Sequence, residues 1–393
     1  MTGPPAGPAE PAADPAEQAR AVIEYCYEQG WTDGLPVVPA TRSGVEAFLA
    51  TTERGPDEII GSAPHLGRSI TVAQAAANAI MAGCRPEYFP VVLAAWEAVN
   101  LERSARGAWQ STSGPSPLIV VNGPVRSRLG INYQGGVFGP GFRANATIAR
   151  AIGLIVRNGY GIRPQELEQA TQGLPGRWSV CLGENEELSP WEPFSVVGGV
   201  APGVDAVSAI LIRTCEYVDN RGTDSPEAVL TDFADTLARM GAYVGGGHSS
   251  GGLVLGPEHA QLFGRYGWSR ADVQQWLFEH AVRDRADLVA AGKGGEDNPV
   301  SDPARAGTRF PMLPSARDIP ILVAGAAKRR DVDGLPPVRL GAVVPTLGPR
   351  GLAAGALAGA LWELTRARSS ASPRPTAGPG RRASSRTRST RAA

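Results

Sequence analysis

The sequence predicts an α/β protein with a mixed sheet and helices packed on it. Short apolar runs alternate along the chain with longer amphipathic segments, which is typical of this class. The 393 residues, 42% of them hydrophobic, are enough for a sizeable core. No apolar run reaches the roughly 18 to 20 residues of a membrane span. The predicted body covers 16–345 and could form two lobes, 16–200 and 201–345.

Composition predicts disordered tails at 1–15 and 366–393. The first is rich in Pro and Ala, and the second holds eight arginines and no acidic residue. Because the whole chain has a formal net charge of zero, residues 1–365 carry −8. An acidic body argues against nucleic acid as the primary partner. The N-terminus lacks a basic and then apolar leader, so a cytoplasmic location is expected and no membrane role.

In the first part of the chain, apolar spacing and capping residues define the elements. Ser43 and Thr71 suit N-caps, and Pro86 suits a first helical turn. The apolar run 117–122 predicts a buried strand. Helices are expected at 16–29, 43–51, 72–82, 86–99 and 144–155, with a short strand at 35–39.

The rest of the body continues the alternation. Strands are expected at 178–182, 206–212, 253–255 and 319–323, and helices at 225–240, 258–265 and 269–288. No repeat at solenoid periods is evident. Asp-Gly-Leu-Pro occurs at both 33–36 and 333–336, which we attribute to chance.

The most informative segment is a glycine-rich loop, 135–142, that opens an amphipathic helix. Gly139 and Gly141 would let backbone N–H groups approach a ligand, and the helix N-terminus favours a negative charge. Arg143 and Asn145 stand next to the loop. A P-loop lysine and spaced dinucleotide glycines are missing, so we expect a small anion here and not specifically a nucleotide.

Arg143, Arg150 and Arg157 are spaced seven apart and fall roughly on one line of the helix. They could extend the anion site, or they could solvate an exposed face and pair with surface acids. The functional interpretation is strongest for Arg143.

A second candidate is the segment 177–192, where a strand with Cys181 runs into four carboxylates. Crowded acids raise one another's pKa, which is a route to a general acid or base near neutral pH. Glu184 and Glu192 are the preferred pair, and Glu186 and Glu187 are expected to solvate a loop. Cys181 is a candidate catalytic thiol or a small buried hydrophobe.

Cys84 lies between two expected helices, after a Gly83 suited to a C-cap. A following helix N-terminus and the neighbouring Arg85 would both stabilise its thiolate, so Cys84 is a candidate catalytic residue and Arg85 a candidate substrate-binding residue. A tight turn between helices is the structural alternative.

His259 begins a helix directly after an expected strand, where ligands of α/β sheets bind. It is a candidate proton-transfer group. With four histidines and no H-E-x-x-H pair, no metal is expected. The cofactor requirement stays open.

Several of these motifs resemble those of a poorly characterised bacterial family whose genes often lie beside short CGSC- or UGSC-type proteins and selenoproteins. The resemblance covers about residues 20–325, and departs from the pattern at Ala149 and after Val323. It rests on the segments 31–39, 78–88, 141–151, 184–192, 256–260 and 267–269. It implies thiol or selenol chemistry and a short cysteine-motif partner.

Taken together, these features predict an enzyme acting on a small anionic substrate in bacterial secondary metabolism. We first expect a lyase that cleaves or forms a carbon–heteroatom bond, of the sulfur type, or an enzyme of thiol-dependent redox chemistry. The alternative is a non-catalytic subunit that binds an anion or scaffolds a complex with the short partner.

Overall fold

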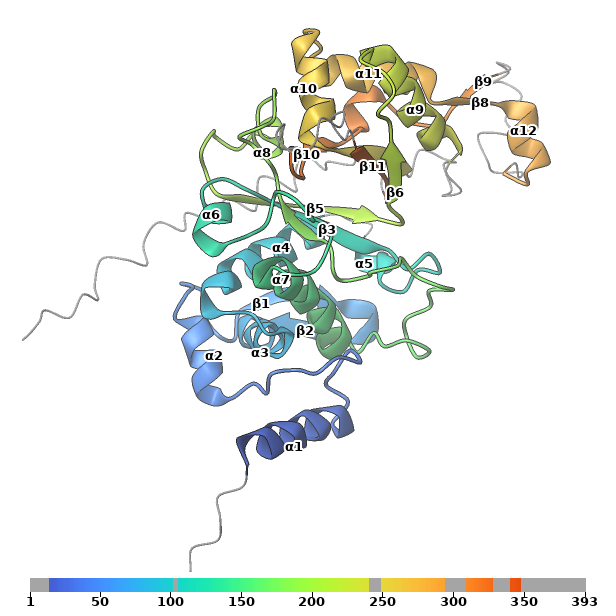
Figure 1. Ribbon diagram of the computed structural model, residues 1–393. Coiled ribbons are helices and arrows are strands. Elements are labelled where there is room, and N and C mark those ends of the chain that lie inside the picture. The colour runs from blue at the N-terminus through green and yellow to red at the C-terminus, as the bar shows by residue number, and fades with distance from the viewer. Residues whose placement is uncertain (1–13, 102–104, 240–248, 294–308, 328–339, 348–393) are drawn as a thin grey trace, which may run out of the picture.

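The computed structural model describes residues 14–101, 105–239, 249–293, 309–327 and 340–347. Within them the chain forms an α/β fold around one mixed sheet with the strand order β10-β7-β11-β5-β3-β4 (Figure 1). Strand β6 also pairs with β11. The strands of this sheet are β3 (Ser116–Asn122), β4 (Cys181–Gly183), β5 (Ala206–Ile212), β6 (Glu216–Asp219), β7 (Ser249–Leu255), β10 (Ile321–Val323) and β11 (Leu340–Leu347).

Helices and two small two-stranded sheets complete the fold. These sheets pair β1 (Ile59–Ala63) with β2 (Arg68–Thr71) and β8 (Val282–Asp284) with β9 (Arg309–Pro311), antiparallel in both cases. The main helices are α1 (Pro15–Glu28), α2 (Arg42–Leu49), α3 (Val72–Ala82), α4 (Phe89–Leu101), α7 (Arg143–Leu154), α9 (Pro226–Arg239), α10 (Pro257–Arg265) and α11 (Arg270–His280). Shorter ones are α5 (Ala105–Ala108), α6 (Val125–Leu129), α8 (Phe194–Val197) and α12 (Arg285–Ala290).

The sheet is built from two halves with the same connectivity. Strand β3 comes after α4 and the short α5, and β7 comes after α9. Each strand leads through a Gly-Pro step into the next helix. Each also pairs in parallel with a later edge strand, β4 or β10, and antiparallel with a later inner strand, β5 or β11. The halves join where β5 and β11 pair at Ile212 and Thr346. The two halves repeat the same order and pairing of strands. The expected boundary between lobes, at 200/201, lies just before β5, which pairs within the first half.

The two edge strands also meet at their carboxyl ends. The backbone N–H of Asn185, just after β4, donates to the carbonyl of Val323 in β10 at 2.7 Å. Since β4 and β10 stand at opposite ends of the strand order, the sheet must curl until its edges touch. This closure brings polar residues of both halves together.

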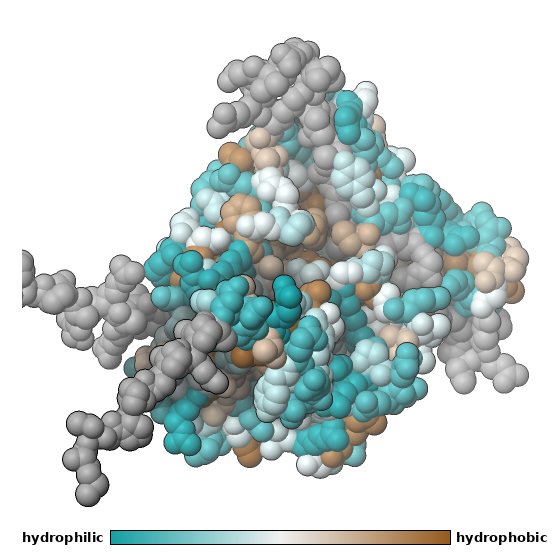
Figure 2. All heavy atoms as spheres, turned by 60° about the horizontal axis from the view of Figure 1, so that its bottom comes forward, coloured by the Kyte–Doolittle hydropathy of each residue, from teal (hydrophilic) through white to brown (hydrophobic). Residues whose placement is uncertain are grey.

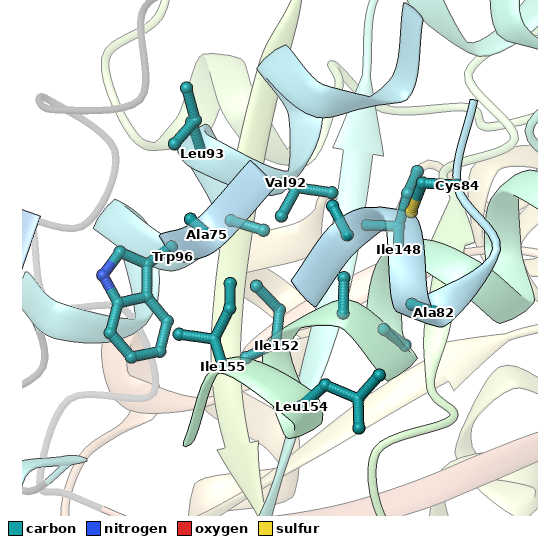
Figure 3. Packing of buried hydrophobic residues seen from close by; sticks show 14 of the residues in the cluster. Ala75, Ala82, Cys84, Val92, Leu93, Trp96, Ile148, Ile152, Leu154 and Ile155 are labelled. Carbon is teal, nitrogen blue, oxygen red and sulfur yellow. The ribbon is translucent and has the colours of Figure 1, made fainter. Parts of the chain in front are cut away.

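The apolar residues form three main layers, one on the inner face of the sheet and one on the outer face of each half. Alternate strand residues of both halves, such as Val120, Leu182 and Val254, share one buried cluster on the inner face. On the outer faces, helices α3, α4 and α7 cover the first half and α9 to α11 cover the second. Figure 3 shows part of the first outer cluster, including Trp96 and Ile152.

Most element predictions are confirmed, because capping residues and apolar spacing act locally. Helix α3 has the expected Thr71 cap as a full capping box, and Gly83 ends it with φ 92°. The strand expected at 206–212 matches β5. Both expected tails lie outside the described residues, except for 14–15, where α1 begins. The second Asp-Gly-Leu-Pro segment, 333–336, also lies outside them.

Four local predictions are wrong. The segment 35–39 forms no strand, because Arg150 binds its carbonyls instead of a neighbouring strand. Thr41 and not Ser43 caps α2. Residues 86–88 form a 3₁₀ turn before α4 begins. Helix α11 stops at His280, where the chain enters strand β8.

Candidate functional site

A buried polar cluster lies at the carboxyl ends of β3 and β4. Asn122 is the last residue of β3, Glu184 follows β4, and Arg126 lies in α6 directly after β3. Glu186 and Glu187 come from the turn after β4. Because β3 and β4 are parallel neighbours, their ends place these side chains at one edge of the sheet, where α/β folds bind ligands.

Glu184 is the centre of the cluster and is 0% exposed. Its Oε2 accepts hydrogen bonds from Asn122 Nδ2 and from the backbone N–H of Phe194, both at 2.6 Å. Its Oε1 is enclosed and has no hydrogen-bond partner. Burial raises the pKa of Glu184, and the hydrogen bonds and the charge of Arg270 only partly oppose it. The neutral acid is therefore favoured at this position more than at an ordinary glutamate.

Asn122 joins Glu184 to a second carboxylate. Its Nδ2 also donates to Glu186 Oε1 at 2.9 Å, and the Gly123 N–H donates to the same oxygen at 2.7 Å. Gly123 has φ 86°, and a Cβ there would lie 2.7 Å from the Val204 carbonyl oxygen, so only glycine fits. The result is a pair of carboxyl groups held by one amide.

Arg126 balances the acidic side of the cluster. Its guanidinium forms ion pairs with Glu186 at 3.1 Å and Glu187 at 3.0 Å, and donates to the carbonyls of Gly123 and Glu184. The arginine is 4% exposed. A Cβ at Gly183 would stand 3.1 Å from Arg126 Cδ, which explains the glycine in β4. Glu186 is thus part of the cluster and does not simply solvate a loop, whereas Glu187 is exposed, as expected, and pairs with Arg126 from the surface.

The second half of the chain contributes Arg270, the first residue of α11. Its Nη2 lies 3.9 Å from Glu184 Oε1 and donates to the carbonyl of Glu192 at 2.7 Å. The guanidinium also lies over the ring of Trp191. Burial lowers the pKa of Arg270. The Glu192 side chain is exposed, so it does not form the expected buried pair with Glu184.

Three enclosed polar atoms in this cluster lack partners: Glu184 Oε1, Asn122 Oδ1 and Arg270 Nε. Unsatisfied buried groups cost about 1–3 kcal/mol each, so their concentration in one place needs an explanation. A proton on Glu184, a bound water or a ligand would each satisfy part of the set. This cluster is the candidate site.

The glycine-rich loop borders the cluster. Preceding the loop, Tyr133 packs under the Arg126 guanidinium at 4.7 Å and its carbonyl accepts from the N–H of Gly325. A Cβ on Gly135 would lie 3.4 Å from Ala326. Asn185 Nδ2 donates to the Gly325 carbonyl at 2.9 Å. The loop thus lies against residues that follow β10 and close to the turn that carries Glu184.

Within the loop, the glycines form a tight turn before α7. The Gly139 N–H donates to the Gly136 carbonyl at 2.7 Å, and Gly141 has φ 124°. Phe142 is the N-cap of α7 and provides no side-chain cap. The first N–H groups of α7 therefore face the loop without the usual capping oxygen.

Arg143 and Asn145 both have structural partners. Arg143 Nε donates to the Gly83 carbonyl at 2.9 Å, so this exposed arginine caps α3. Asn145 is buried and donates to the carbonyls of Asn132 and Cys181. It positions β4 against the start of the glycine loop, and it has no free donor for a ligand.

The thiols lie in the first outer core. Cys84 is buried beside Ile148 (Figure 3), and burial raises its pKa to about 12 despite Thr147 and Arg143. The expected thiolate stabilisation is wrong, because desolvation outweighs the nearby charges. Burial and the neighbouring Cys84 also raise the pKa of Cys181. Arg85 is exposed and forms no ion pair with the described residues.

Cys181 and Glu184 point away from each other. Cys181 belongs to the outer core, whereas Leu182 belongs to the inner cluster. Successive side chains of a strand alternate between faces, so Glu184 leaves the sheet on the side of Leu182. A single site using both groups would have to reach through the sheet.

His259 lies in the second half. It is fully buried, its Nε2 lies 3.2 Å from the Asn220 carbonyl oxygen, and its ring packs edge-on against Phe233. Phe233 belongs to the apolar layer of α9 and α10, whereas Glu184 accepts its hydrogen bonds from Asn122 and from the backbone of Phe194. His259 occupies the place that Arg126 has in the first half, three residues after the glycine of the Gly-Pro step.

The composition of the 177–192 segment indicated Glu184 as a site residue, but no sequence pattern had indicated Arg126 or Arg270. Arg126 follows a buried strand and a Gly-Pro step, a signal that could have been used. Arg270 has no comparable signal, because only the closure of the sheet brings it to Glu184.

Among the described residues no group of three or more His, Cys, Asp or Glu side chains is arranged to hold a metal. Likewise, none of the described helices is long and apolar enough to cross a bilayer. Comparison with protein-family models, curated proteins and solved structures found no match for this chain. The site must therefore be interpreted from its own chemistry.

Proposed function

We propose that this protein is an enzyme that transfers protons on a small anionic substrate, with Glu184 as the principal acid. The observation that carries the proposal is the pair formed by Glu184 and Glu186, whose carboxyl oxygens share the Nδ2 donor of Asn122. Glu184 is enclosed and its pKa is raised by burial, whereas Glu186 is ion-paired with Arg126. Two carboxyl groups in unlike environments are a common arrangement for acid–base catalysis.

The reaction class that suits this pair is a carbon–heteroatom lyase. Glu186 would accept a proton from the carbon next to the substrate carboxylate, and neutral Glu184 would donate its proton to the departing sulfur, oxygen or nitrogen. The C–H and C–heteroatom bonds break, a carbon–carbon double bond forms, and the products are an unsaturated acid and the protonated leaving group. One proton is taken up and one is released, so no redox partner is needed.

The negative group of the substrate would bind at the glycine loop. Gly139 and Gly141 expose backbone there, the N-terminus of α7 has no side-chain cap, and Arg143 adds a positive charge at its first turn. The loop packs next to the residues that follow β10 and contacts the turn carrying Glu184 through Asn185 and Gly325.

The thiol-dependent alternative has less support. Cys84 and Cys181 are both buried with raised pKa values, which disfavours the reactive thiolate. A non-catalytic subunit bound to a short CGSC- or UGSC-type protein is the second candidate, and exposed Phe138 and Phe142 on the glycine loop favour it, since partner surfaces use aromatic side chains. A cytoplasmic setting and a role in secondary metabolism belong to the same proposal.

The experiment is an elimination and exchange assay in deuterated water. A panel of small carboxylates with thiol, hydroxyl or amine leaving groups at the β-carbon is followed by NMR for deuterium incorporation and product release. Glu184→Gln should abolish turnover. Glu17→Gln, at an exposed acid of α1 outside the site, should keep it. Arg143→Ala should weaken substrate binding. Equal turnover by Glu184→Gln would overturn the role of Glu184, and no turnover or binding of the whole panel by the wild type would overturn the reaction class.

A further inference from the structure

A group of arginines surrounds the far end of α7, away from the glycine loop. There the helix continues into a π-helical turn, Ile155–Gly159, which contains Arg157, and Arg163 follows it closely in the chain. Arg68 reaches the same place, where its Nη1 donates to the Tyr160 carbonyl. π-Helical turns are rare and frequently occur at functional sites, because they rotate side chains out of the regular helical positions.

Arg157 and Arg163 differ from the other arginines of this face in having no acceptor. Neither guanidinium forms a hydrogen bond or ion pair with the described residues, and the Nε atom of each is enclosed without a partner. Both arginines are half-buried. Arg150, by contrast, binds both oxygens of Asp33 at 2.7 and 2.8 Å.

Both arginines border the turn at Gly30 and Trp31. A Cβ at Gly30 would stand 4.0 Å from both Nη atoms of Arg163, and Asn158, next to Arg157 in the chain, donates to the Trp31 carbonyl. Burial lowers the pKa of Arg157, and the charge of Arg163 lowers it further, while Asp33 and Glu166 oppose the shift. Asp33 is already neutralised by Arg150, and Glu166 is exposed. A folded protein keeps two unpaired like charges side by side at a cost, unless something else compensates them.

We propose that Arg157 and Arg163 form a binding site for an oxyanion of the phosphate class. The guanidinium group of arginine presents two parallel N–H groups that match the spacing of phosphate oxygens. Two such bidentate groups around one ion supply both positive charge and oriented hydrogen bonds. The site is separate from the glycine loop, because it lies at the opposite end of α7. Its function does not depend on the reaction proposed for Glu184.

The surroundings suit such a ligand. The turn at Gly30 lies beside Arg163, since a Cβ there would stand 4.0 Å from both Nη atoms. The Asn158 Nδ2 donates to the carbonyl of Trp31, whose side chain is exposed, and Asn158 Oδ1 is enclosed without a partner. Figure 2 shows hydrophilic residues with hydrophobic ones interspersed on the face that it brings forward.

The test is a titration of the full-length protein with inorganic phosphate, followed by calorimetry and by thermal unfolding. Sodium chloride at equal ionic strength controls for screening. We expect saturable phosphate binding that raises the Tm of the wild type. Arg157→Gln and Arg163→Gln should each weaken phosphate binding at least about tenfold, and should be as stable as the wild type without phosphate because they remove an unpaired charge.

Arg317→Gln, at an exposed arginine of the second half, is the matched control and should bind phosphate normally. Arg157→Lys keeps the positive charge but removes the bidentate N–H donors, so it should also lose affinity for phosphate. It replaces Arg157→Gln in the test if that variant fails to fold. The Glu184→Gln variant should retain phosphate binding, so failure of the Glu184 proposal leaves this one standing. The same response to phosphate and chloride, or normal binding by both glutamine variants, would overturn the site.

Discussion

The Oε1 atom of Glu184 lies 3.9 Å from Nη2 of Arg270, and the two residues come from different halves of the chain. Glu184 follows an edge strand of the first half and Arg270 begins a helix of the second. The contact is too long for a hydrogen bond, so Oε1 of Glu184 stays unsatisfied, and on Arg270 the Nε atom also lacks a partner. The candidate site is therefore assembled by the closure of the sheet.

The buried carboxyl of Glu184 predicts a specific pH dependence of stability. Its pKa in the folded protein is raised above the ordinary value of 4.5, so the folded state holds this proton more tightly than the unfolded chain. As pH rises above 4.5, the wild type should lose free energy of unfolding relative to Glu184→Gln, by about 1.4 kcal/mol for each unit of upward shift. Urea denaturation of both proteins at several pH values measures the difference, and a constant difference would contradict a raised pKa.

Arg126 should be among the most sensitive positions for stability. Arg126→Met would leave Glu186 facing Glu184 without its counter-charge, and breaking a buried ion pair from one side costs about 3 kcal/mol or more. Arg128→Gln, on the same short helix, breaks only a partly exposed pair with Asp205 and should cost less than about 1 kcal/mol. Chemical denaturation compares the two variants. Similar small losses would mean that the Arg126 network contributes little.

The ion pair of Arg150 with Asp33 should hold the 33–36 segment. A double-mutant cycle with Arg150→Ala and Asp33→Ala should give a coupling free energy of about 0.5–1 kcal/mol, kept modest because both side chains are partly exposed. Hydrogen–deuterium exchange should show faster exchange at Leu35 in Arg150→Ala, because Arg150 also binds the carbonyls of Leu35 and Pro36. Unchanged exchange would assign no anchoring role to Arg150.

The cysteines should differ in reactivity. Because burial raises the pKa of Cys84 to about 12, its reactive thiolate is scarce at pH 7, and burial restricts access as well. Iodoacetamide should label exposed Cys215 first in the native protein, and label Cys84 and Cys181 only after unfolding. Mass spectrometry after digestion gives the order, and Cys215→Ser is the control. Rapid native labelling of Cys84 would restore the thiol mechanism.

Local features of the sequence predicted local structure well. Thr71, Gly83 and the apolar spacing of 144–155 specify helices α3 and α7 because caps and periodicity act within a few residues. The same reasoning was wrong at 35–39, where apolar residues suggested a strand. There a distant arginine, Arg150, determines the conformation, and no local pattern reports such a contact.

The sequence predicted a site residue correctly where neighbouring residues alone create its environment. The crowding of acids in 184–192 marked Glu184 as a candidate, and the structure places it in a buried cluster. Sequence analysis could not distinguish Glu192, which is exposed, from Glu186, which Asn122 and Arg126 bind. Nor could it tell that Cys84 is desolvated, because burial depends on how α3, α4 and α7 pack.

By itself, the sequence determined the α/β class, most of the helices and strands, the glycine turn before α7 and the candidacy of Glu184. These depend on caps, periodicity and composition, which are properties of neighbouring residues. Only the tertiary structure decided which charges meet: Arg126 with Glu186 and Arg270 with Glu184, while Arg157 forms no ion pair within the part of the chain that the structure describes. The physical reason is that desolvation and pairing of charges depend on distances between elements far apart in the chain, and the closure of the sheet sets those distances.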